Sequence, residues 1–300
     1  MHFFYPIHIP SLDSVYHFKE FTCEHYKAFL KVILNNNDDV YEMFIDELIT
    51  ELCRDKLNVS RLTGFDKFII MLEIRATNIS SVIEFNMSTT DKEIKKYTVD
   101  INECLSVARS YDIKHRFDIS VDDKLRVRGT LPRKLIMKDW FDVGLHSISE
   151  LTFNNKTISL QSLNKAQKID TISQLPSSIL PKILDYINEQ VKAMKKDYIV
   201  EIPAEDGDDM ELQEVYISPV DGTLPSLIRL LYNYNLKDVY AGQLTLMSEY
   251  KIPNTFINNS TPAELTLYYT LIQQEAERRQ SDQDNKPESP SMPTPPQGIE

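Results

Sequence analysis

The first 79 residues of the chain show two hydrophobic periods in succession. Alternating strand-forming residues on either side of a polar turn predict a hairpin, and apolar residues spaced three and four apart then predict three helices. The predicted strands are 5–10 and 15–21, and the predicted helices begin after Thr22, near Asp38 and near Phe65. The run Asn35-Asn36-Asn37 ends the first of these helices. We therefore expect residues 1–79 to form a hairpin plus helices.

The pattern changes to strands over residues 80–160. Strand-like segments cover 81–87, 97–101, 116–121 and 124–131, and Asn102 is placed to begin a short helix. Within 124–131, Lys124, Arg126 and Arg128 fall on one face and apolar residues on the other, as expected for a strand. This part of the chain is predicted to be a β-rich central region that ends near a turn at residues 154–155.

Helical spacing returns over residues 161–280. A well-patterned helix covers 178–195, and strand-like pieces at 198–202 and 215–218 flank an acidic loop at 201–214, which holds seven carboxylates. Two C-terminal helices follow, the last of which opens on Thr261-Pro262-Ala263-Glu264. Thr suits the N-cap, Pro the first turn, and Glu the third position of a capping box. Leu265, Tyr268, Ile272 and Ala276 are predicted to share the buried face of this helix.

Residues 281–300 contain five prolines and few apolar side chains. Such a segment cannot bury enough surface to offset the entropy lost on ordering, so we expect it to be disordered. Taken together, the patterns predict an α+β fold with helical N- and C-terminal parts, a β-rich central insert and a disordered C-terminal tail.

Composition narrows the function classes. The chain has 300 residues and a net charge of -12, which argues against a protein that coats nucleic acid or an anionic membrane. Its seven glycines form no phosphate-binding loop, and its three cysteines, which lack a CxxC pair, are expected to be buried thiols of a reducing compartment. The sequence also shows no signal peptide and no apolar run long enough for a membrane span.

Candidate chemistry is sparse. His17 and His25 flank a predicted helix start beside Cys23, but no further metal ligand has suitable spacing. The segment 206–211 resembles a loose calcium loop, but it has no glycine at the sixth position and no terminal bidentate glutamate in register. A hidden enzyme site would need His115 or His146 to converge with carboxylates. We predict no catalytic residue, cofactor or metal site.

A basic segment leaves one alternative open. Residues 114–138 carry eight basic and three acidic side chains, so a face with Lys124, Arg126 and Arg128 could contact phosphate. The segment lacks the interleaved aromatic residues on which single-stranded bases would stack. A nucleic-acid-associated factor is therefore the alternative function. The default interpretation is a local salt bridge to the acidic loop, or a solvated edge strand protected by its charge.

The two ends of the chain resemble a known family. The opening HIPSLDSVYHFKEFTCEHYKAFLKVI and the closing LLYNYNLKDVYAGQLTLMSEYKIPNTFINNSTPAELTLYYTLIQQE are similar to the ends of the baseplate hub subunit and hub assembly proteins of T-even-type contractile-tailed phages. The resemblance implies a non-enzymatic protein that acts in assembly of the baseplate central hub. Its implied partners are other tail proteins, namely hub subunits and the tape-measure protein, met in the host cytoplasm during assembly. Retention in the virion tail baseplate and formation of a homo-oligomer are left open.

Partner contacts are expected in the C-terminal segment and the acidic loop. Tyrosine, methionine and leucine side chains are typical of interface cores but also of ordinary protein cores, so both interpretations stay open for them. The predicted partner-binding residues are Tyr232, Tyr240, Met247, Tyr250, Leu265, Tyr268, Asp206, Asp208 and Asp209.

Overall fold

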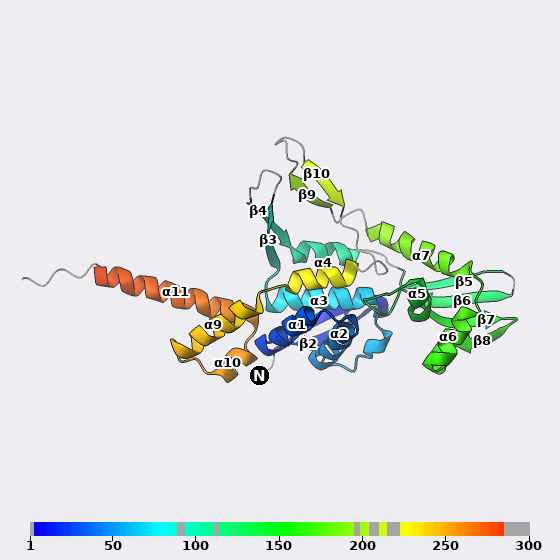
Figure 1. Ribbon diagram of the computed structural model, residues 1–300, viewed down its shortest axis with the longest axis horizontal. Helices are drawn as coiled ribbons and strands as arrows, with labels where there is room; N and C mark the ends of the chain where they lie inside the picture. Colours follow the sequence, from blue (N-terminus) through cyan, green and yellow to red (C-terminus); the bar gives the residue numbers. More distant parts are fainter. Residues whose placement is uncertain are drawn as a thin grey trace, which may run out of the picture.

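The computed structural model describes residues 3–88, 94–110, 114–122, 124–194, 199–203, 210–214 and 223–284. The molecule is elongated, with a helical body in the middle, a four-stranded sheet at one end and helix α11 projecting from the other (Figure 1). Helices and small antiparallel sheets alternate along the chain. The predicted α+β fold class is confirmed.

The N-terminal part is the predicted hairpin followed by helices. Its elements are β1 (Phe4–Ile9), η1 (Pro10–Leu12), β2 (Ser14–Lys19), α1 (Cys23–Asn35), α2 (Asp38–Leu52), η2 (Val59–Arg61) and α3 (Gly64–Asn78). Strands β1 and β2 pair antiparallel, and α3 is buried along nearly its whole length. Helix α3 is therefore the centre about which the other elements pack.

Helix boundaries here follow from local chemistry. Asn36 adopts a left-handed conformation with φ of 50° and ends α1, while the Asn37 side chain accepts hydrogen bonds from the N–H groups of Asp39 and Val40 and begins α2. Asparagine tolerates left-handed backbone and is a good N-cap, so the Asn run separates two helices without a long loop. Thr22 begins α1 as predicted, in a capping box closed by His25.

The centre contains the predicted strands, together with two further strands and one helix that the pattern did not indicate. The elements are β3 (Val82–Ser88), β4 (Ile94–Asp100), α4 (Ile101–Ser110), β5 (Arg116–Ser120), β6 (Leu125–Thr130), α5 (Trp140–Ser147), β7 (Ile148–Phe153), β8 (Lys156–Ser159) and η3 (Leu160–Ser162). Strands β5 to β8 form one antiparallel sheet in sequence order. Asp100, rather than Asn102, begins α4, since its carboxylate accepts from the Asn102 N–H at 2.9 Å.

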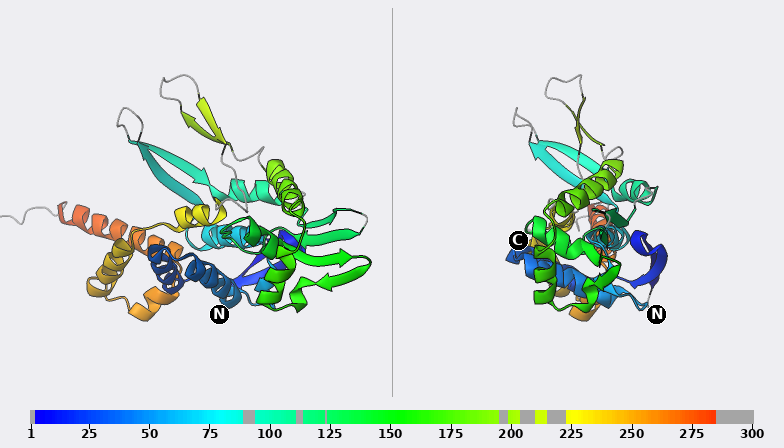
Figure 2. Two further views of the ribbon diagram at one scale, coloured as in Figure 1. Left: turned by 45° about the vertical axis from the view of Figure 1, so that its right-hand side comes forward. Right: turned by 90° about the vertical axis from the view of Figure 1, so that its right-hand side faces the viewer.

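The acidic segment is only partly a loop. After α6 (Lys165–Ser173) and α7 (Ile179–Met194), β9 (Ile199–Pro203) pairs antiparallel with β10 (Met210–Glu214). The predicted loop at 201–214 therefore includes a strand, and the predicted second strand at 215–218 lies outside the described residues. Hairpins β3–β4 and β9–β10 both project from the same side of the body (Figures 1 and 2).

Four helices complete the described chain. They are α8 (Thr223–Tyr232), α9 (Leu236–Ser248), α10 (Asn254–Asn259) and α11 (Pro262–Asp284). Helix α11 continues through Asp284, so the first four residues of the segment predicted to be disordered are helical, and 285–300 lie outside the described residues.

Two groups of buried apolar residues hold these elements together. The larger runs through all parts of the chain from Tyr5 to Tyr232 and includes α8. The smaller consists of Cys23, Leu246, Ile257 and Leu265, with Ile252, Tyr269 and Ile272 packed against it. Helices α9 to α11 thus share a small core of their own, to which α1 contributes Cys23.

Candidate partner-binding surfaces

Helix α8 is anchored in the main core. The Tyr232 hydroxyl donates to the Met71 carbonyl oxygen at 2.6 Å, and the Tyr41 hydroxyl donates to the Pro225 carbonyl oxygen at 3.3 Å. The Arg75 side chain donates from Nε to the Leu231 carbonyl oxygen at 2.6 Å. These contacts fix α8 against α2 and α3.

The α9–α11 unit, residues 236–284, rests on α1. The Cys23 N–H donates to the Ser260 carbonyl oxygen at 2.8 Å, and Lys27 Nζ donates to Gln243 Oε1 and Asn258 Oδ1. The predicted capping box of α11 is present, because the Thr261 N–H donates to Glu264 Oε2 and the Glu264 N–H donates to Thr261 Oγ1. The unit therefore has a defined fold and is attached to α1 both through hydrogen bonds and through the buried Cys23.

One face of α9 is apolar and exposed. Tyr240, Leu244 and Met247 are spaced at i, i+4 and i+7, which places them on one side of the helix, and they are 39%, 63% and 38% exposed. We call these three residues the α9 stripe. Large exposed patches of this kind mark interaction sites more often than scattered single residues do.

A second apolar cluster joins α10 and α11. The rings of Phe256 and Tyr268 meet edge to face with centroids 5.5 Å apart, and both side chains remain partly exposed. Leu267 and Leu271, which also belong to α11, are 58% and 51% exposed. The apolar surface of the unit thus extends beyond the α9 stripe.

The partner-binding residues predicted from sequence differ in how far the structure exposes them. Tyr240, Met247, Tyr250 and Tyr268 are exposed as the partner interpretation requires. Tyr232 and Leu265 are buried, at 1% and 7% exposure, because Tyr232 fills the space between α1 and α3 and Leu265 fills the small core. These two are core residues in this conformation and present no surface to a partner.

The predicted acidic residues Asp206, Asp208 and Asp209 lie outside the described residues.

The sequence analysis did not identify Leu244, Phe256 and Leu271 as surface residues. The sequence does contain a sign of this surface, namely a low frequency of charged residues. Between Tyr240 and Gln274 only Glu249, Lys251 and Glu264 are charged, whereas charged residues make up 26% of the chain. Interface cores are depleted of charge in the same way.

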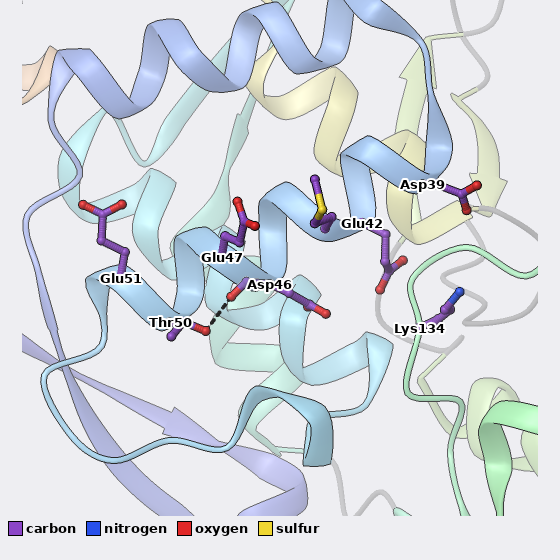
Figure 3. Close-up of a pocket in the computed structure, with 8 residues that line it drawn as sticks. Asp39, Glu42, Asp46, Glu47, Thr50, Glu51 and Lys134 are labelled. Carbon is purple, nitrogen blue, oxygen red and sulfur yellow. Dashed lines mark hydrogen bonds between the residues drawn. The ribbon is translucent and has the colours of Figure 1, made fainter. Parts of the chain in front are cut away.

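Helix α2 lines a shallow depression of about 620 Å³ (Figure 3). Its carboxylates belong to Asp39, Glu42, Asp46, Glu47 and Glu51, with Met43, Thr50 and Lys134 completing the lining. Burial raises the pKa of Asp46 even though the Lys67 ammonium lies 2.6 Å away and lowers it. Lys67 also pairs with Glu42, so part of the acidic charge is compensated from within the protein.

The basic face of β6 is neutralised within its own sheet. Arg126 and Arg128 both donate to the Asp118 carboxylate on β5, and Arg128 lies 3.6 Å from Glu150 on β7. Hydrogen bonding from Arg126 lowers the pKa of Asp118. Both arginines thus pair locally, but with carboxylates of neighbouring strands, where the prediction had named the acidic loop. Strand β6 is also an inner strand of its sheet, so the edge-strand interpretation is wrong.

The histidines are dispersed. His17 contacts Asp55 and His25 contacts Thr22 and Glu51, so the two do not form a joint site. Burial lowers the pKa of His115 and lowers that of His146 to about 4. Among the residues that the structure describes, no group of three or more His, Cys, Asp or Glu side chains is placed to hold a metal ion.

Within the same residues, none of the helices combines the length and apolar character needed to cross a membrane.

An uncharged apolar surface on a compact helical unit is the feature of a protein that binds other proteins. The family of T4 bacteriophage base plate proteins matches residues 2–203, well over half of the chain, and the chain belongs to this family. It is therefore a baseplate protein of a T4-type phage, which agrees at that level with the resemblance of its opening segment. No curated protein and no solved structure matches the sequence.

Proposed function

We propose that the protein acts without catalysis in assembly of the baseplate central hub, where it holds hub subunits or the tape-measure protein in position. The observation that carries the proposal is the α9 stripe together with the near absence of charge from Tyr240 to Gln274. Covering such a face removes apolar surface from water without desolvating charges, which favours stable association.

The location of this face also supports the proposal. The family match ends at residue 203, and the α9–α11 unit begins at Leu236. The matched part would supply the features common to baseplate proteins of this family. The unit beyond it would supply contacts particular to this chain, and we infer that it selects the neighbouring tail protein.

Affinity capture from infected cells tests this function. A copy with a C-terminal tag is expected to recover named hub and tape-measure proteins in a fixed ratio, as determined by mass spectrometry. The double variant Leu244→Asp with Met247→Asp is expected to lose them, because two carboxylates would have to be buried at the interface. Phe153→Asp, on β7 at the far end of the molecule and with a similarly exposed side chain, is the matched control.

The outcomes separate the alternatives. Recovery of hub proteins by wild type and by Phe153→Asp, but not by the double variant, supports hub assembly through this unit. Unchanged recovery with the double variant would place the interface elsewhere. Recovery of baseplate proteins outside the hub would contradict the hub role.

A further inference from the structure

Two lysines of α1 stand at one end of the α9 stripe. Lys27 Nζ and Lys31 Nζ lie 5.7 Å and 6.0 Å from the centroid of the Tyr240 ring. Lys31 is exposed, whereas the Lys27 side chain is 91% buried. We call Lys27, Lys31, Tyr240 and Gln243 the lysine corner. It concentrates positive charge in a chain whose net charge is -12.

The charge of the lysine corner is not compensated from within the described part of the chain. Lys27 Nζ donates to two amide oxygens, Gln243 Oε1 at 3.1 Å and Asn258 Oδ1 at 2.6 Å, which are neutral. Neither lysine has a carboxylate within 4.0 Å among the described residues. Lysines four residues apart on one helix also repel each other. A buried ammonium is costly unless an anion accompanies it.

A third donor at the corner is unused. Gln243 is 95% buried, and its Nε2 has no hydrogen-bond partner within the described structure, although its Oε1 accepts from Lys27. Buried polar donors are paired in the great majority of proteins. Lys27 itself has three N–H groups and uses two of them on these amides. The corner therefore holds two ammonium groups around one tyrosine ring, and the buried Gln243 that accepts from Lys27 has a carboxamide N–H without an acceptor among the described residues.

We propose that the lysine corner receives a carboxylate of the partner protein, from an acidic residue beside the apolar residues that cover Leu244 and Met247. This inference rests on the proposed function and specifies the partner surface as an apolar patch bordered by an Asp or Glu. A carboxylate supplies an acceptor for the exposed Lys31 ammonium and a counter-charge for the buried Lys27 beside it, and the uncharged stripe next to them requires apolar contact. Nucleic acid fits less well, because its next phosphates would meet that uncharged stripe.

Binding to overlapping peptides from the tail proteins of the same phage tests the inference directly. The full-length chain is expected to retain peptides in which Asp or Glu adjoins apolar residues, and replacing that acid by its amide should weaken binding roughly tenfold. Lys31→Gln should weaken binding similarly without affecting folding, because Lys31 is exposed. Lys56→Gln, at an exposed position away from the corner, is the matched control.

Several results would overturn the inference. These are retention of basic or uncharged peptides only, failure to retain any peptide, retention only of peptides from this chain itself, and equal binding by wild type and Lys31→Gln. Preference for single-stranded DNA over all peptides would do the same. Capture from infected cells keeps the two proposals apart. If Lys31→Gln still captures hub proteins while the Leu244 and Met247 double variant does not, the lysine corner fails and the hub function stands.

Discussion

The carboxylate of Glu42 on α2 lies 2.8 Å from the ammonium of Lys67 on α3, and the two side chains are only 10% and 3% exposed. The same carboxylate accepts hydrogen bonds from the backbone N–H groups of Leu135 and Ile136. One buried side chain thus ties two N-terminal helices to the segment that leads into α5. Glu42 therefore connects the helical and β-rich parts of the chain.

Removing the cation should be strongly destabilising. Lys67→Met leaves the Glu42 carboxylate buried with its backbone donors but without its counter-ion, and we expect a loss of about 3–5 kcal/mol of unfolding free energy. The measurement is urea unfolding followed by circular dichroism. Lys56→Met, at an exposed position, should change the unfolding free energy very little. Equal stabilities of the two variants would show that the buried pair contributes nothing.

Replacing Gly242 on α9 by alanine should lower the unfolding free energy in the wild-type chain but not in a chain that lacks the Tyr269 hydroxyl. A Cβ at this position would lie 2.5 Å from the Tyr269 hydroxyl oxygen, so Gly242→Ala should loosen α9 from α11 and cost about 1–3 kcal/mol. In the Tyr269→Phe background the obstructing oxygen is gone, and alanine should then be neutral or favourable because it is the better helix former. A double-mutant cycle in urea measures the coupling. Additive effects would mean that the two positions do not touch.

Acid should weaken the protein partly through His146. Burial lowers its pKa to about 4 from the ordinary 6.5, so between these values the unfolded chain binds a proton that the folded chain does not. The stability contributed by neutral His146 is complete above pH 6.5 and is lost as the pH falls through this window. Urea midpoints near pH 7 and about pH 5 should therefore differ less for His146→Gln than for wild type. His8→Asn, at an exposed position, is the control, and an identical pH dependence of wild type and His146→Gln would contradict the prediction.

Nucleic-acid binding should be absent from the wild-type chain and weakly inducible. Arg126 and Arg128 are paired with Asp118, so we expect no retention of DNA in a filter-binding assay at physiological salt. Asp118→Asn removes the shared anion and should produce weak binding that salt abolishes. Salt-dependent binding by the wild-type chain at comparable affinity would instead revive the alternative function.

The sequence predicted most elements whose pattern is dictated by burial. Helices α1, α2, α3 and α7 have one apolar face or more, and hairpin β5–β6 alternates cleanly, so hydrophobic period alone located them. Helix α5 was not predicted, because its start depends on a local contact in which the Asp139 side chain accepts from the Asp142 N–H, within a region predicted to be β-rich. Strand β10 was not predicted either, because its carboxylates suggested a loop, although Met210 and Leu212 alternate with polar residues.

The candidate surface was harder to predict than the fold. Tyr232 and Tyr240 are the same residue type in one segment, yet one is buried beside Phe29 and the other is exposed on α9. Composition cannot distinguish them, because the difference arises from which helix packs on α3. The lysine corner was also beyond sequence reasoning, since Lys27 and Gln243 are 216 positions apart and meet only through the docking of α9 on α1.

Cys23 lies at the boundary between α1 and the α9–α11 unit, where burial raises the pKa of its thiol to about 12. A thiolate is the reactive form, so this side chain resists alkylation as long as the unit stays docked. In a variant in which the other two cysteines, Cys53 and Cys104, are replaced by serine, modification of Cys23 would report how often the unit separates from the body. The rate of Cys23 modification therefore measures how often this boundary opens, and a bound tail protein that holds the unit in place would lower that rate.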